Sequence, residues 1–309
     1  MLISRMAQAF AALATTLTVL LAGTAEAGTA ARGQENRPQL LFFNHAYGVL
    51  DRVTADAVEH SAYLREFAHF QVRTTTGTGG VTWKGRYLFG RETYFELFGV
   101  GDLPDTGYGS AGMAVSVERA GGLATVVEGM RDQGVADPVQ FLQTRDFGDG
   151  VPVPWFDAVY ATDEIDAFLG WGMEYRAEYF ADPRGNTEPP AYPGDVGRER
   201  YLPDLYRDRL MRDVTGVRIA ITSGDLADTV PLLRAGGFTV RPLPNGGVVA
   251  LRGGTKMRLD VVPRDQVGLR RIDMSLNRSV SSRHEERIGR STLAVGPGPR
   301  AVWTFPDVE

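Results

Sequence analysis

The 309-residue sequence contains no cysteine and only two lysines, Lys84 and Lys256. The absence of cysteine excludes disulfide bonds, a thiol nucleophile and a zinc–thiolate site. A domain that is exported without disulfides must be stabilised by packing alone. The formal net charge is −5, so the basic surface expected of a nucleic-acid or anionic-membrane binder is not indicated. We therefore expect no nucleic-acid partner.

Long apolar runs are also scarce, because only residues 7–25 form one. This run follows the positive charge of Arg5, is diluted by threonine, and ends at Ala25-Glu26-Ala27, where small residues suit signal peptidase. The pattern predicts a signal peptide over residues 1–27, cleaved near Ala27, and hence a secreted or extracytoplasmic protein with no stable membrane anchor after cleavage. An uncleaved anchor is the alternative.

Hydrophobic periodicity after this segment repeats one order of elements. The first unit has a strand at 40–49, a helix at 54–67 with Thr54 as its N-cap, and strands at 69–75, 83–89 and 93–98. The second unit has a strand at 111–118, a helix at 123–132, and strands near 139–144, 155–162 and 168–175. The third has a strand at 217–222, a helix at 226–235, and strands at 238–241, 248–251 and 257–261.

These repeats predict an α+β fold of βαβββ modules. Two modules pair in residues 36–180, and a Pro/Gly-rich, unstructured connector follows at 181–204. The third module and a degenerate fourth, whose helix is reduced or lost, occupy residues 205–309.

Two motifs carry a resemblance to a known superfamily. NHAYGVLD at 44–51 and RETYFELFG at 91–99 resemble the first module of vicinal oxygen chelate proteins, among them glyoxalase I, extradiol dioxygenases and bleomycin-resistance proteins. In detail the chain is most similar to a glyoxalase-like family of exported proteins. The resemblance implies that each pair of modules forms a cupped mixed sheet around a central site.

The resemblance also implies a metal site. His45 on the first strand, Glu96 on the fourth and Glu174 on the last strand of the second module match ligand positions. An imidazole and two carboxylates would suit Fe, Mn, Zn or Ni. The opening strand of the second module has no histidine, so a four-ligand glyoxalase site is incomplete. In the alternative interpretation, Glu96 faces outward and His45 is a hydrogen-bonded wall residue.

Aromatic residues near these positions are expected to line the cup or to pack in the core. They are Tyr94, Tyr175, Trp83 and Trp171. His284 lies in a highly charged stretch that predicts an exposed loop, although it could close over a pocket.

Two function classes remain open. The first is a metal-dependent lyase, isomerase or dioxygenase acting on a small oxygenated molecule, and the second is a non-catalytic protein that binds or sequesters a small molecule. No residue is assigned a catalytic role, and neither a nucleophile elbow nor a phosphate loop is present, so no nucleotide cofactor is expected. The two classes differ in whether His45, Glu96 and Glu174 converge within about 2.0–2.3 Å of one point.

Overall fold

The chain contains four successive β-rich units, which a computed structural model describes over residues 38–308. The predicted signal peptide lies outside the described residues. The first unit contains β1 (Leu41–Leu50), α2 (Arg52–His60), α3 (Ala62–Phe67), β2 (His69–Gly77), β3 (Thr82–Phe89) and β4 (Tyr94–Gly99). The second contains β5 (Ala111–Val117), α4 (Gly122–Asp132), β6 (Val139–Asp146), β7 (Val153–Tyr160) and β8 (Phe168–Tyr175).

The third unit has the same order and the fourth lacks the helix. The third contains β9 (Met211–Ile221), α7 (Ser223–Ala235), β10 (Thr239–Pro242), β11 (Val248–Leu251) and β12 (Lys256–Val261). The fourth contains β13 (Gly268–Val280), β14 (His284–Ile288), β15 (Ser291–Val295) and β16 (Gly298–Thr304). The predicted α+β fold of repeated βαβββ modules is confirmed.

The first two units form a closed barrel with the strand order β1-β4-β3-β2-β6-β7-β8-β5. Strands β1 and β5 join the units at one side. At the other side β2 and β6 meet through only two residue pairs, Thr76 with Asp146 and Gly77 with Arg145. Just beyond this short ladder, Thr78 Oγ1 accepts a hydrogen bond from the Thr144 amide at 2.8 Å. The cupped sheet that we expected is therefore closed into a barrel by a narrow seam.

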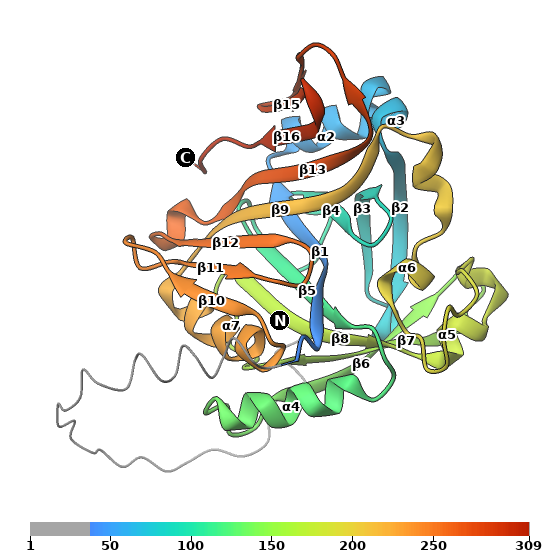
Figure 1. Ribbon diagram of the computed structural model, residues 1–309, viewed down its shortest axis with the longest axis vertical. Coiled ribbons are helices and arrows are strands. Elements are labelled where there is room, and N and C mark those ends of the chain that lie inside the picture. Colours follow the sequence, from blue (N-terminus) through green and yellow to red (C-terminus); the bar gives the residue numbers. More distant parts are fainter. Residues whose placement is uncertain (1–37, 309) are drawn as a thin grey trace.

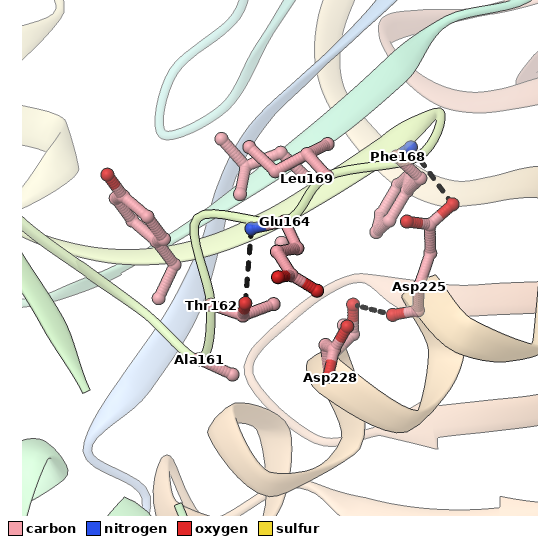
Figure 2. Close-up of a pocket in the computed structure, with 11 residues that line it drawn as sticks. Ala161, Thr162, Glu164, Phe168, Leu169, Asp225 and Asp228 are labelled. Carbon is pink, nitrogen blue, oxygen red and sulfur yellow. Dashed lines mark hydrogen bonds between the residues drawn. The ribbon is translucent and has the colours of Figure 1, made fainter. Parts of the chain in front are cut away.

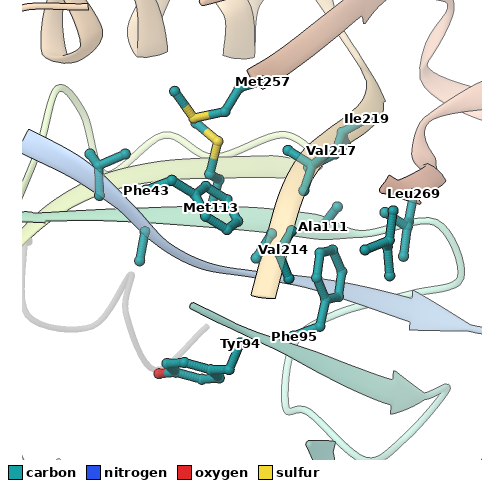
Figure 3. Close-up of a cluster of buried hydrophobic side chains, with 14 of the residues drawn as sticks. Phe43, Tyr94, Phe95, Ala111, Met113, Val214, Val217, Ile219, Met257 and Leu269 are labelled. Atoms are coloured by element: carbon teal, nitrogen blue, oxygen red, sulfur yellow. The ribbon is translucent and has the colours of Figure 1, made fainter. Parts of the chain in front are cut away.

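The third and fourth units form an eight-stranded sheet, β10-β11-β12-β9-β13-β16-β15-β14. This sheet lies across the outside of the barrel, over β1 (Figure 1). Phe43 and Met113 from the barrel meet Val217 and Met257 from the sheet, and all four are at most 2% exposed (Figure 3). One hydrophobic core thus spans both sheets.

The predicted helix over 54–67 is in fact two short helices. Asp51, not Thr54, caps α2, because its carboxylate accepts the Thr54 amide. Ser61 ends α2 and begins α3, since its hydroxyl accepts the Leu64 amide. A serine that can cap a new helix competes with continuation of the old one.

The segment 181–204 is not the unstructured connector that we expected. It contains α6 (Arg198–Tyr201) and follows α5 (Ala177–Ala181). Arg198, Tyr201 and Leu202 are buried, and the Arg198 guanidinium donates to the Phe43 carbonyl at 2.7 Å. Frequent proline and glycine prevented long elements here, but the apolar and arginine side chains still pack against the barrel.

No helix within residues 38–308 is long and apolar enough to cross a membrane.

Candidate functional site

The interior of the first barrel brings together His45 and Glu96. A register shift in β1 between Phe43 and His45 changes the strand alternation, as β-bulges do. His45 pairs with Tyr94 on β4, so Glu96 lies one pleat along on the same face. Nε2 of His45 lies 3.9 Å from Oε1 of Glu96, and these side chains are 6% and 13% exposed. The distance leaves room for a bridging group, not a direct hydrogen bond.

Three of the four predicted pocket aromatics lie in one connected ring cluster that includes His45, and Trp83 is joined to that cluster by a hydrogen bond. The Tyr94 ring stacks on His45 with centroids 4.3 Å apart, and Trp171 meets the same imidazole edge-on at 5.3 Å. Tyr201 of α6 stacks on Tyr175 at 4.2 Å and approaches Tyr94. Trp83 donates from Nε1 to the Tyr87 hydroxyl at 3.2 Å, and Tyr87 continues the cluster through Phe89 to Tyr94.

Asn44 determines which nitrogen of His45 carries the proton. The Asn44 amide nitrogen donates to the Ser116 hydroxyl at 2.9 Å and to the Tyr175 hydroxyl at 3.2 Å. Its carbonyl oxygen then faces Nδ1 of His45 at 2.8 Å. Because an amide oxygen can only accept, Nδ1 is the protonated nitrogen. Nε2 therefore presents a free lone pair toward Glu96.

Burial favours the neutral form of both members of the pair. It lowers the pKa of His45 from 6.5 to about 3. It also raises the pKa of Glu96 from 4.5 to about 7, a rise that the nearby Arg73 guanidinium opposes. Desolvation disfavours the charged form of each group. Below about pH 7 the contact is thus a neutral base beside a carboxylic acid, and it is not an ion pair.

Glu174 does not join them, and this corrects the expected ligand set. Its carboxylate accepts the amides of Gly121 at 2.7 Å and Leu123 at 3.0 Å, at the start of α4. On β8 the adjacent Trp171 and Tyr175 contact the barrel interior. Side chains alternate between the faces of a strand, so Glu174 points outward and neutralises the helix N-terminus.

The donor set does not fit the three-ligand metal site that the resemblance implied. One imidazole nitrogen and one carboxylate converge, whereas catalytic metal sites commonly have three protein ligands. Across residues 38–308 no group of three or more histidine, aspartate or glutamate side chains is placed to hold a metal ion. On β5 the residue paired with His45 is Ala114, and on β8 the residue paired with Ala114 is Trp171, so neither neighbouring strand supplies a ligand at this level.

Two recesses lie outside the barrel and are too small for an organic ligand. One, beside the β7–β8 turn and α7, is lined by Glu164, Asp225 and Asp228 (Figure 2). Its cavity volume is about 10 Å³, room for roughly one water. Asp225 there accepts the amides of residues 166–168, which gives it a structural role. The second, near Thr54 and Leu269, has a volume of about 20 Å³.

His284 lies on β14 and not in the loop that its charged surroundings predicted. It is exposed, its Nε2 lies 3.2 Å from Glu286, and its ring stacks on Tyr63 at 4.9 Å. Alternating charges on an edge strand have the same composition as a solvated loop. The contacts of His284 with Glu286 and Tyr63 thus lie on the exposed surface of the protein.

Among the site residues that the sequence analysis did not single out are Asn44 and Arg73. Asn44 is next to His45, and only the bulge brings both into the site. Arg73 lies on β2 with its guanidinium over the Tyr87 ring at 4.3 Å. The alternation of polar with apolar residues over 69–73, which places Arg73 on one face of the strand, was the available signal for Arg73.

The fold and site define a protein of paired βαβββ modules with a polar, aromatic-lined barrel interior. The chain belongs to the family described as "Family of unknown function (DUF5829)", whose model matches residues 43–305. No curated protein matches the sequence significantly.

Solved structures with a similar arrangement include a hypothetical protein from Staphylococcus aureus, with TM-score 0.47 and 9% identity over 84% of this chain and 99% of that one. The Mn(II)-bound glyoxalase from Novosphingobium aromaticivorans has TM-score 0.40 and 8% identity over 88% of this chain and 84% of its own. An extradiol ring-cleaving dioxygenase from B. fuscum has TM-score 0.37 and 11% identity over 74% of this chain and 56% of its own.

Proposed function

We propose that this is a glyoxalase-like protein of the vicinal oxygen chelate type that binds a small oxygenated molecule inside the first barrel. There the His45–Glu96 pair moves protons to and from the bound molecule. The observation that carries the proposal is the Asn44-fixed tautomer of His45, which directs an unprotonated Nε2 at a carboxyl group 3.9 Å away.

The chemistry follows from the two groups in their neutral forms, which for Glu96 predominate below about pH 7. His45 Nε2 takes a proton from a carbon or hydroxyl of the bound molecule, and Glu96 gives its own proton to a carbonyl oxygen of the same molecule. For a carbonyl compound the C–H bond breaks, an O–H bond forms, and the product is the enol. The imidazolium and carboxylate left behind stabilise each other at short range. The reverse transfer restores both groups.

The aromatic cluster supports the binding part of the proposal. Apolar walls with a few convergent polar groups are typical of small-molecule sites. The barrel closes through only two residue pairs between β2 and β6, and the packing of α5 and α6 supplies Tyr179 and Tyr201 at its interior. We propose that a ligand enters when the β2–β6 seam or the helices α5 and α6 move away from the barrel.

Proton transfer can be tested without knowing the physiological substrate. We would incubate the protein in D2O with small hydroxy ketones and 2-oxo acids and follow loss of the carbon-bound proton signal by NMR. We expect at least one compound to exchange faster with the wild type than with His45→Gln or Glu96→Gln. His60→Gln, at an exposed position on α2, is the matched control and should behave as wild type.

If the wild type exchanges no compound faster than His45→Gln, the proton-transfer proposal is wrong. Binding of a compound without exchange would instead support a sequestering protein. Elemental analysis of wild type, His45→Ala and Glu96→Ala would show whether any divalent metal depends on this pair.

We also propose that the protein is exported and its first 27 residues removed. The basis is the apolar run at 7–25 ending at Ala25-Glu26-Ala27. Mass spectrometry of the protein from its native host should show a chain that begins at residue 28. A chain that begins at Met1 would contradict cleavage.

A further inference from the structure

The first barrel contains an arginine that has no carboxylate partner. Arg73 lies on β2 opposite Gly85 of β3. Its guanidinium is held over the rings of Tyr87 at 4.3 Å and Phe89 at 5.2 Å. Its Nε is buried and has no hydrogen-bond partner. In the described part of the chain no ion pair with an aspartate or glutamate is formed by Arg73.

Two buried arginines of this protein, by contrast, have carboxylate partners. Arg86 on the outer face of β3 is paired with Glu59 and Asp102. Arg198 in α6 is paired with Glu118 and Glu92. Arg73 is part-buried, with no carboxylate to offset the desolvation of its charge, so it is held at an energetic disadvantage.

The stacking leaves the Nε–H group of Arg73 without a protein acceptor. A guanidinium that lies over an aromatic ring uses its face for the cation–π contact, while its N–H groups point outward in the plane. The Nε–Nη edge matches the two oxygens of a carboxylate in a bidentate pair. Opposite Arg73, Gly85 has no side chain that could compete for this edge, and a Cβ there would clash with the Tyr87 ring at 2.6 Å.

A second cation reinforces the positive potential at this side of the barrel. Arg145 on β6 donates to the Tyr179 hydroxyl at 2.6 Å and also lacks an ion pair among the described residues. Both Arg145 and Arg73 act on Tyr179, lowering its pKa against the larger, raising effect of burial. The carboxyl group that interacts with Arg73 is Glu96, and Glu96 is largely protonated below pH 7.

We infer that the barrel takes a small organic acid whose carboxylate binds the Nε–Nη edge of Arg73, with its remaining atoms against the aromatic walls. The placement of those atoms beside His45 and Glu96 rests on the proposed function. A carboxylate beside Arg73 repels a charged Glu96, so binding of the acid favours the protonated Glu96 that the proton-transfer step needs. An organic acid fits better than an inorganic anion because Tyr87, Phe89, Tyr94 and Trp171 offer rings and few hydrogen-bond donors.

Calorimetric titration of the mature protein tests the inference. The probes are acetate and benzoate, their neutral counterparts acetamide and benzamide, and inorganic phosphate. We expect at least one carboxylate to bind at millimolar or lower concentration at pH 6, and its amide to bind at least tenfold more weakly. Arg73→Met should weaken carboxylate binding at least tenfold. Arg283→Met, which removes an exposed arginine paired with Glu285, should leave binding unchanged.

Thermal unfolding guards against a folding defect in the variant. Because Arg73→Met replaces an unpaired cation by an apolar side chain of similar length, its melting temperature should equal or exceed that of wild type. A variant that has lost carboxylate binding and yet melts at or above the wild-type temperature supports the inference.

The remaining outcomes separate this inference from the proposed function. Carboxylate binding that depends on Arg73 but survives His45→Gln, without proton exchange, leaves the inference standing and removes the catalytic role. Equal binding of amide and acid, or of Arg73→Met and wild type, overturns it. Tighter binding of phosphate than of either carboxylate, or no binding of any probe, overturns it as well.

Discussion

At the scale of single residues, the site depends on groups whose charge is suppressed by burial. His45 alone would titrate near neutrality, but inside the barrel its pKa falls to about 3. Glu96 moves in the opposite direction, to about 7. The two shifts give stability contributions with opposite dependence on pH.

The first prediction concerns this pH dependence. Between pH 4.5 and about 7 the folded state binds more protons at Glu96 than the unfolded chain does, so the contribution of Glu96 to stability falls as pH rises. Between about 3 and 6.5 the unfolded chain binds more protons at His45, so that contribution rises with pH. Glu96→Gln removes the contribution that falls as pH rises, which is worth up to about 3 kcal/mol of unfolding free energy.

We therefore expect the free energy of unfolding of Glu96→Gln to rise more steeply than that of wild type from pH 4.5 to 6.5. Urea unfolding at a series of pH values measures this. Glu66→Gln, at an exposed glutamate, is the control and should keep the wild-type slope. Parallel curves for wild type and Glu96→Gln would show that Glu96 is not buried as the structure has it.

At the scale of elements, the ends of helices explain residues that looked functional in the sequence. The N-cap position of helix α4 is Gly121, which has no side chain to cap the helix. The carboxylate of Glu174 reaches over from β8 and accepts two of its free amides. Glu174, which matched a metal-ligand position in the sequence, therefore caps a neighbouring helix instead.

The second prediction follows from this cap. Glu174→Ala should lower the free energy of unfolding by about 1–2 kcal/mol, the usual range for a lost cap. It should leave carboxylate binding and proton exchange at the barrel unchanged. Chemical denaturation with both assays checks it, and Glu128→Ala, on the exposed side of α4, should cost less. Loss of ligand binding in Glu174→Ala at full stability would return Glu174 to the site.

At the scale of the whole molecule, the barrel and the eight-stranded sheet share one core. Phe43 and Met113 of the barrel are fully buried against residues of β9 and β12. Arg198 and Tyr201, between the two halves in sequence, also pack against the barrel. We expect the described part of the chain to unfold as one unit.

The third prediction tests this unity. Met113→Ala should destabilise the protein by about 2–5 kcal/mol. Circular dichroism and tryptophan fluorescence, which reports on Trp171 in the barrel and Trp303 in the outer sheet, should move together in a single transition. Leu142→Ala, at a side chain 41% exposed, should have little effect. Two transitions of which only one shifts would show that the halves are independent.

The sequence by itself determined the modules. Apolar periods of two and 3.6 residues, with glycine at the turns, predicted the order of nearly all elements, because these patterns depend on local geometry and on burial of one face. The resemblance to vicinal oxygen chelate proteins, and not the periodicity, pointed to His45 and Glu96 as neighbours. Reliance on local pattern also explains two errors. Ser61 caps a new helix inside what looked like one helix, and residues 181–204 pack against the barrel although their composition is typical of an unstructured connector.

Only the tertiary structure decided which side chains meet. The bulge in β1 turned Asn44 inward, the pleat of β8 turned Glu174 outward, and the seam between β2 and β6 closed a cup into a barrel. A shift of one residue exchanges the two faces of a strand, and no spacing in a single sequence reveals such a shift. The isolation of Arg73 from any carboxylate is likewise a property of three-dimensional packing.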